Sequence, residues 1–173
     1  GGMIFNAVEH RLRSESQIAW EIWHITRTNM SESMQGLYST ALQALMHTDQ
    51  QSLALEKARQ DAEGIDPLIA GAALWTLSRA IQTHKLNEFD LENCVAVLIR
   101  KTGEASTEIQ QLAIRAVANA SLKDERLMSK LVRLAPEHGD NTLAVIANFL
   151  FMNQQDLSVS SLHFKPLLQS LVG

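Results

Sequence analysis

The chain has 173 residues, of which 46% are hydrophobic and 20% charged, and its formal net charge is -4 at pH 7. A chain of this length forms one domain with a substantial core, and its composition excludes disordered and fibrous proteins. The acidic balance disfavours a nucleic-acid-binding protein, since such proteins usually carry a basic stripe or a basic domain.

The first predicted elements lie in the N-terminal thirty residues. Apolar residues at helical spacing predict a short helix over residues 4–13 and a second helix that starts at Ser14–Gln17, which fits a capping box. The second helix carries Trp20 and Trp23 one turn apart and is apolar almost all the way round. We therefore expect these tryptophans either in the core or at a dimer or partner interface. Asn29 is expected to end the helix in the left-handed conformation.

Further short helices with short connections are expected along the rest of the chain. Asp66–Pro67 is the strongest start signal, because Asp supplies a cap oxygen and Pro at the first helical position loses no needed hydrogen bond. Gly64 is expected to end the preceding helix with a left-handed residue, and Asp90 is expected to cap the helix that starts at Leu91. The expected helices span residues 31 or 33 to 45, 49–62, 67–83, 91–101, 107–117, 124–134, 143–152, and 162 or 166 to 172.

Several of these helices share a short sequence. Ala41–Leu45 matches Ala73–Leu77 and Ala113–Val117, and a shorter match begins the same way at Ala144. The matching alanines are 32, 40 and 31 residues apart, and each such helix is followed by a second amphipathic helix. The sequence therefore predicts repeated helix pairs, which pack antiparallel when their connections are short.

From about residue 31 to residue 173, this pattern resembles the HEAT and armadillo class of α-solenoids, although their repeats of about 40–47 residues are longer. Asp66–Pro67 resembles the proline-led first helix of many HEAT units, whereas a ladder of matching Asp and Arg residues is not evident. The resemblance implies an all-α stack of antiparallel helix pairs in a single domain, residues 1–173, with residues 1–30 as N-terminal capping helices. A nonrepetitive helical bundle, also all-α, is the alternative.

One predicted helix carries a basic stripe. Lys123, Arg126, Lys130 and Arg133 recur at intervals of three, four and three residues, and Arg115 lies near them if successive units stack. One interpretation of the stripe is a surface that binds an acidic partner or a phosphate backbone. The other is an ordinary solvent-exposed helix face. Interleaved aromatic residues, on which single-stranded nucleic acid stacks, are missing, so nucleic acid is the less favoured partner.

No pattern predicts catalysis, a cofactor or a metal site. None of the six histidines lies three to five residues from another, and HExxH, paired cysteines and glycine-rich phosphate-binding motifs are missing. The single cysteine, Cys94, sits in an apolar run and is expected to be buried. Because a lone cysteine cannot form a disulfide within the chain, it favours a cytoplasmic protein. The apolar runs are far shorter than the roughly 20 residues that a membrane-spanning helix needs, so no membrane is expected as a partner.

The leading hypothesis is a noncatalytic protein–protein interaction or scaffold module that presents a helical groove to another protein. Its candidate contacts are Trp20, Trp23, Arg115, Arg126, Lys130 and Arg133, and a homodimer is one form that such an interaction takes. The first alternative is a HEAT-like nucleic-acid-binding protein that uses the basic stripe. The second is a helical small-molecule-binding protein or enzyme with a pocket near Trp75, His84 or His47.

Overall fold

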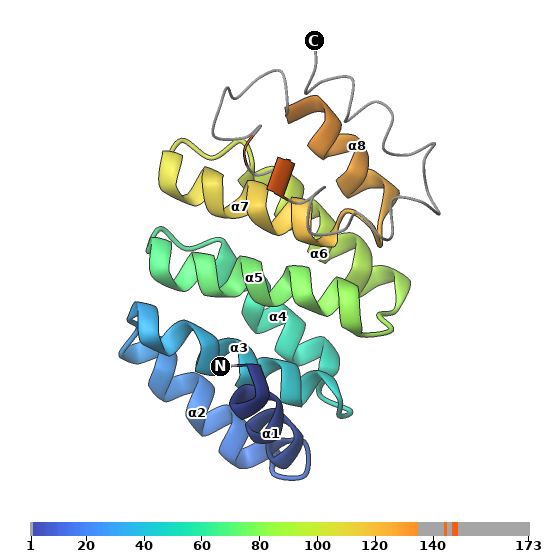
Figure 1. The fold of residues 1–173 in the computed structure, drawn as a ribbon. Helices are drawn as coiled ribbons and strands as arrows, with labels where there is room; N and C mark the ends of the chain where they lie inside the picture. Colours follow the sequence, from blue (N-terminus) through green and yellow to red (C-terminus); the bar gives the residue numbers. More distant parts are fainter. Residues whose placement is uncertain (1, 135–143, 145–146, 149–173) are drawn as a thin grey trace.

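The computed structural model describes residues 2–134, 144 and 147–148. Within these residues it contains eight α-helices, one short 3-10 helix at Glu32–Met34 and no β-strand, which confirms the predicted all-α fold (Figure 1). None of the described helices combines the length and apolar character that crossing a lipid bilayer requires. The helices are α1 (Gly2–Leu12), α2 (Ser16–Thr28), α3 (Gln35–Met46), α4 (Gln51–Ala62), α5 (Pro67–Thr83), α6 (Glu88–Lys101), α7 (Thr107–Ala120) and α8 (Glu125–Leu134).

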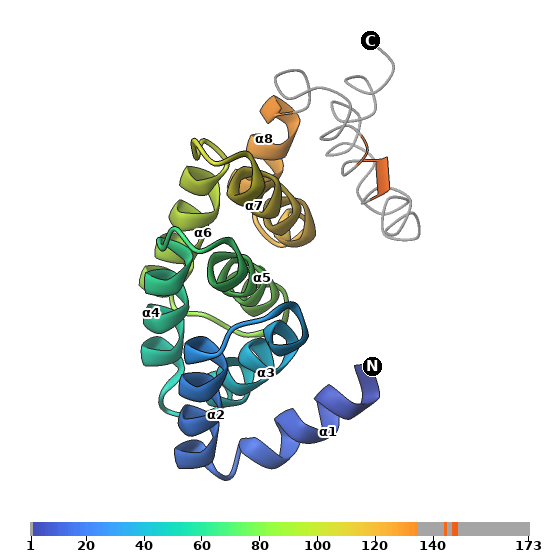
Figure 2. The ribbon, with the colours of Figure 1, turned by 90° about the vertical axis from the view of Figure 1, so that its left-hand side faces the viewer.

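The described helices lie in two rows. We call α3, α5 and α7, which pack side by side, the odd row, and α2, α4, α6 and α8 the even row (Figures 1 and 2). Helices from α2 onward therefore alternate between the rows, while α1 packs against α3. Short connections force each helix to reverse direction, and each neighbour covers part of an apolar face. The helices predicted over residues 143–152 and 162–172 fall almost wholly outside the described residues.

The core lies between the two rows and consists mainly of leucine and alanine. Burying one leucine side chain contributes about 1.5–3 kcal/mol to stability. Small residues let helices of the odd row approach closely: a Cβ atom built on Gly71 of α5 would lie 3.0 Å from Leu112 Cδ1 of α7. The fully buried leucines are Leu42, Leu45, Leu55, Leu74, Leu77, Leu98, Leu127 and Leu131.

Glutamine side chains connect neighbouring helices of the odd row. Gln35 Nε2 of α3 donates to the Leu68 carbonyl oxygen of α5 at 2.9 Å, and Gln43 Nε2 donates to the Thr76 carbonyl oxygen at 3.0 Å. One step along the row, the Gln82 side chain of α5 donates to a backbone carbonyl of α7. These side-chain amides are thus paired, as buried polar groups need to be, whereas the buried Ser39 hydroxyl of α3 has no hydrogen-bond partner among the described residues.

Ion pairs connect successive helices of the even row. They are Arg27–Asp61 at 2.7 Å between α2 and α4, Arg59–Asp90 at 3.4 Å between α4 and α6, and Arg100–Glu63 between α6 and the end of α4. The partners are 34, 31 and 37 residues apart in the sequence. This irregular spacing explains why no Asp/Arg ladder was evident from the sequence.

The strongest predicted helix start is confirmed. Asp66 Oδ1 accepts hydrogen bonds from the backbone N–H groups of Leu68 at 2.9 Å and Ile69 at 3.3 Å, and a proline follows it at the first helical position. Ser106 and Asp124 accept comparable bonds from the first turns of α7 and α8. These three starts follow from local chemistry alone.

At three other predicted boundaries the expected cap or left-handed residue is wrong, although α2 and α4 end where predicted. Ser14 does not cap α2, because its hydroxyl donates to the Arg11 carbonyl oxygen at the end of α1, at 3.1 Å. Asn29 ends α2 at a φ of -117°, outside the left-handed region, and both its backbone N–H and its side chain bond to the Ile25 carbonyl oxygen. Gly64 does not adopt a left-handed φ either. The chain turns at these points without the expected left-handed residue.

Candidate functional site

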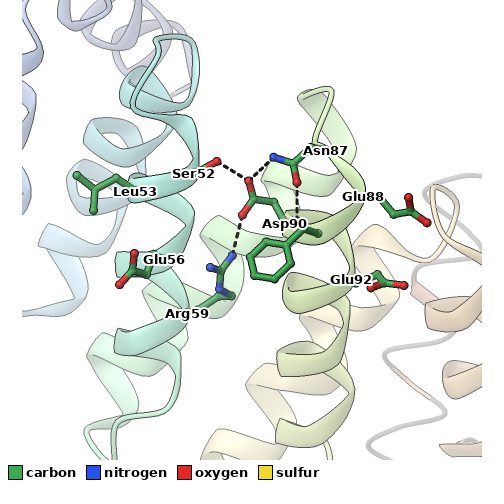
Figure 3. A pocket seen from close by; sticks show the side chains of 9 residues that line it. Ser52, Leu53, Glu56, Arg59, Asn87, Glu88, Asp90 and Glu92 are labelled. Carbon is green, nitrogen blue, oxygen red and sulfur yellow. Dashed lines mark hydrogen bonds and ion pairs between the residues drawn. The ribbon is translucent and has the colours of Figure 1, made fainter.

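A cleft of about 880 Å³ lies between α4 and the start of α6, and we call it the α4–α6 cleft (Figure 3). It joins residues more than thirty positions apart, because α4 and α6 are neighbours only through the alternation of the two rows. Its lining residues are Ser52, Leu53, Glu56, Arg59, Asn87, Glu88, Phe89, Asp90 and Glu92.

Asp90 forms the polar floor of this cleft and is only 1% exposed. The prediction that Asp90 caps its helix is wrong: α6 begins at Glu88, and Asn87 Oδ1 accepts the Asp90 N–H at 2.8 Å. The Asp90 carboxylate instead accepts from Ser52 Oγ at 2.6 Å, Asn87 Nδ2 at 2.8 Å and Arg59 Nη1 at 3.4 Å (Figure 3). Asp90 is thus fully paired and joins α4 to α6, rather than standing ready to exchange a proton with a substrate.

The rim of the cleft combines apolar and acidic side chains. Phe89 is 70% exposed and Leu53 is 44% exposed, one from each helix. The exposed carboxylates of Glu56, Glu88 and Glu92 also line the cleft, with Glu56 on α4 and Glu88 and Glu92 on α6, where Figure 3 shows the two α6 carboxylates pointing away from α4. Since Arg59 is bound to Asp90, the rim combines an apolar surface with an excess of negatively charged side chains.

Cys94 is buried one turn after Asp90, as the sequence predicts. Its Sγ lies 4.0 Å from Arg59 Nη1. Burial nevertheless raises the pKa of the Cys94 thiol to about 11, against the smaller opposing effect of Arg59. The thiol is therefore protonated at neutral pH, which a nucleophilic cysteine is not.

A second hollow, of about 420 Å³, crosses the odd row, and we call it the odd-row pocket. Trp75 of α5, which is 50% exposed, and the exposed Arg115 of α7 line it. Glycine and alanine form much of the remaining surface. Phe5 of α1 reaches its edge, since a Cβ on Gly36 would lie 2.8 Å from the Phe5 ring.

The predicted basic stripe is only partly assembled. Arg126, Lys130 and Arg133 of α8 line one hollow of about 420 Å³. Arg115 lies in the odd-row pocket instead, and Lys101 at the end of α6 is buried and bonds to a glutamate oxygen at 2.7 Å.

The Arg126 guanidinium is held by its own helix cap. Its Nη2 lies 2.7 Å from Asp124 Oδ2 and its Nε lies 3.1 Å from Asp124 Oδ1. Hydrogen bonding to Asp124 raises the pKa of Arg126, and the same bonds lower the pKa of Asp124 even though burial opposes this. One cation of the stripe is thus partly neutralised inside the chain.

Trp20 and Trp23 pack against the core rather than standing on the surface. Their rings meet edge to face, with centroids 5.5 Å apart, and Trp20 Nε1 donates to Gln50 Oε1 at 2.5 Å. The exposed apolar residues of α2 are Ile18 and Ile25. The partly buried tryptophans therefore tie α2 to the rest of the chain.

The structure brings together two histidines that the sequence separates. The rings of His47 and His84 lie at the ends of α3 and α5, with centroids 4.4 Å apart. His84 Nε2 donates to Gln43 Oε1 at 2.7 Å, since the Gln43 amide nitrogen is already a donor to Thr76. Burial, and secondly the neighbouring His47, lower the pKa of His84 to about 4, so His84 is neutral at pH 7.

Buried Glu9 of α1 completes this polar cluster. Its carboxylate accepts from Arg13 Nη2 at 3.0 Å and Arg79 Nη2 at 3.2 Å, and its Oε1 lies 3.2 Å from His47 Nε2. Within residues 2–134, no three His, Cys, Asp or Glu side chains gather closely enough to hold a metal ion. The cluster anchors α1 to the ends of two odd-row helices.

Sequence reasoning missed the rim of the α4–α6 cleft, because it singled out none of Leu53, Glu88, Phe89 and Glu92 as a site residue. One signal was available: Phe89 is a large aromatic residue between two acidic residues, outside the apolar stripe of α6. No protein-family model, curated protein or solved structure matches this chain.

Proposed function

We propose that this protein is a noncatalytic interaction module that binds another protein through the surfaces of its helix rows. The observation that carries the proposal is that large apolar side chains line two hollows on opposite rows, Trp75 in one and Phe89 with Leu53 in the other. Exposing such side chains to water is unfavourable, and large aromatic residues in hollows are typical contacts of protein partners.

The polar groups beside these hollows support binding over catalysis. Asp90 is satisfied by three donors within the chain, and the neighbouring Cys94 thiol is protonated and buried. Neither group is exposed, the Asp90 oxygens are occupied by donors from the chain, and the Cys94 thiol is not in the ionised form that a nucleophile needs.

We also propose that the architecture is a short HEAT-like α-solenoid in the cytoplasm. Three observations support the repeat: α3, α5 and α7 lie side by side, each contains one of the matching Ala–Leu-type segments, and ion pairs connect successive even-row helices. A single reduced cysteine fits a cytoplasmic protein. Stacked helix pairs expose long surfaces on both rows, which suits the recognition of other proteins.

Site-specific photocrosslinking in cells that make the protein tests the proposed function. A photoreactive amino acid replaces Trp75, Phe89 or, as a control, Ile65, which is 93% exposed but lines neither hollow. Discrete protein adducts are expected from position 75 or 89 and not from position 65. An adduct of twice the chain mass identifies a second copy as the partner, whereas the same adduct pattern at all three positions, or none, contradicts the proposal.

A further inference from the structure

We propose that the α4–α6 cleft binds a basic peptide segment of a partner protein, in which a lysine or arginine flanks an apolar side chain. This inference rests on the proposed function and names the chemistry of the partner at one of the two surfaces. It follows from three features of the cleft: its uncovered apolar residues, the excess of carboxylates at its rim, and its internally paired floor.

The apolar component of the partner follows from Phe89 and Leu53. Leu55, only two residues after Leu53 on α4, is fully buried, so α4 divides its leucines between the core and the cleft. Phe89 precedes the buried stripe of α6 and is the most exposed large apolar residue of that helix. An apolar partner surface that packs over both side chains removes them from water.

The basic component follows from the charges around this apolar surface. Glu56, Glu88 and Glu92 are exposed there, and Arg59, the one cation among the described lining residues, is bound to Asp90. Arg126 of α8 interacts electrostatically with Glu92, but its guanidinium is hydrogen-bonded to Asp124. A lysine or arginine from a partner therefore finds carboxylates that no described lining cation is free to balance. Arginine suits the site particularly well, since its planar guanidinium can bind a carboxylate through two hydrogen bonds.

The floor of the cleft is organised before any partner arrives. Ser52, Arg59 and Asn87 all bind the Asp90 carboxylate, and this fixes the relative position of α4 and α6 (Figure 3). A preorganised surface loses little conformational entropy on binding, which favours even a short partner segment. The same charges repel nucleic acid and acidic proteins, and in the described part of the chain the carboxylates do not form a metal-binding group.

Selection of random linear peptides on the full-length protein tests this inference. We expect the enriched peptides to combine lysine or arginine with a neighbouring leucine, methionine or aromatic residue. Their affinity should fall about tenfold or more for Glu88→Lys/Glu92→Lys, since two attractions become repulsions. It should fall comparably for Phe89→Ser and weaken as salt is raised, because exposed charge pairs are screened.

Matched variants separate the cleft from the rest of the surface. Glu21→Lys/Glu108→Lys changes the net charge by the same amount at exposed positions outside the cleft, and Trp75→Ser removes the aromatic residue of the odd-row pocket. Both variants should bind the selected peptides like the wild type. Circular dichroism checks that every variant is folded.

The possible failures are distinguishable. Neutral or acidic enriched peptides, peptides that depend on Trp75 and not on Phe89, or no enriched peptide at all would each overturn the basic-segment inference. None of these results removes the proposed interaction function, which the crosslinking at positions 75, 89 and 65 decides independently. Discrete adducts at position 75 alone would still support the proposed interaction function, and they would place the partner at the odd-row pocket.

Discussion

Neighbouring helices are held together by different kinds of contact in the two rows. In the odd row, α3, α5 and α7 touch through glycine, alanine and leucine, and glutamine amides bind the carbonyls of the next helix. In the even row, long charged side chains bridge successive helices, and α4 and α6 leave a cleft between them.

This difference separates stability from recognition. Close apolar packing gives the odd row and its contacts with the even row most of the burial that stabilises the fold. The Arg59–Asp90 pair, whose side chains are 17% and 2% exposed, contributes less because burying both charges costs desolvation energy, but it holds α4 and α6 in place while Phe89 and Leu53 remain uncovered. We expect substitutions in the two regions to affect stability to very different extents.

The largest expected effect on the free energy of unfolding is that of Leu74→Ala, for which Leu53→Ala is the matched comparison. Leu74 of α5 is fully buried, so its truncation leaves a cavity and should lower the free energy of unfolding by about 3–4 kcal/mol. Leu53 of α4 is the same residue type at the cleft rim, and its truncation should cost less than about 1 kcal/mol. Urea denaturation followed by circular dichroism measures both, and equal losses would abolish the distinction between the regions.

The next effect compares two carboxylates at the end of α4. Asp61 is buried and accepts from Tyr38 Oη at 2.8 Å and Arg27 Nε at 2.7 Å. Asp61→Ala leaves the buried Tyr38 hydroxyl unpaired and should lower the free energy of unfolding by about 2–3 kcal/mol.

Glu63→Ala is the matched control, because it removes an ion pair with Arg100 in which both side chains are largely exposed. Its cost should be below about 0.5 kcal/mol. If the two alanine variants melt at the same temperature, the Asp61 site is not the stabilising contact that its burial indicates.

A smaller effect depends on pH and tests the polar cluster at the ends of α3 and α5. The pKa of His84 falls from its ordinary value of 6.5 to about 4 in the folded chain, mainly through burial. The unfolded chain therefore binds more protons between these pH values, and stability decreases as the pH falls from 6.5 toward 4. The loss should be about 1–2 kcal/mol, less than the full shift implies because the ring is partly exposed.

His84→Gln removes the titrating ring and keeps an amide donor that can face Gln43. The pH dependence of its unfolding free energy should be flatter than that of the wild type between pH 6.5 and 4. Parallel profiles for the two proteins would show that protonation of His84 does not act on stability in this range.

The sequence is most informative where structure depends on neighbouring residues. Asp66, Ser106 and Asp124 open helices as expected, and apolar spacing predicts the all-α fold, because capping and amphipathicity act within a few residues. The repeated Ala–Leu segments mark α3, α5 and α7, which the structure places side by side.

Features that depend on residues far apart in the chain could not be predicted from the sequence. Asp90 looked like a helix cap, yet its partners Ser52 and Arg59 lie 38 and 31 residues away, and only the stacking of α4 and α6 brings them together. His47 and His84 meet because α3 and α5 lie side by side. Arg115 was expected beside the basic stripe, but it lies on α7 in the odd-row pocket, because successive helices alternate between the rows.

The unfolding free energy of Leu53→Ser/Phe89→Ser tests the central claim most directly, namely that the cleft is reserved for a partner. If nothing in the chain covers these side chains, the double variant should be as stable as the wild type, within about 1 kcal/mol. A loss of more than about 2 kcal/mol would mean that the chain buries both residues itself. The α4–α6 cleft would then be part of the core, and the proposed partner site would be wrong.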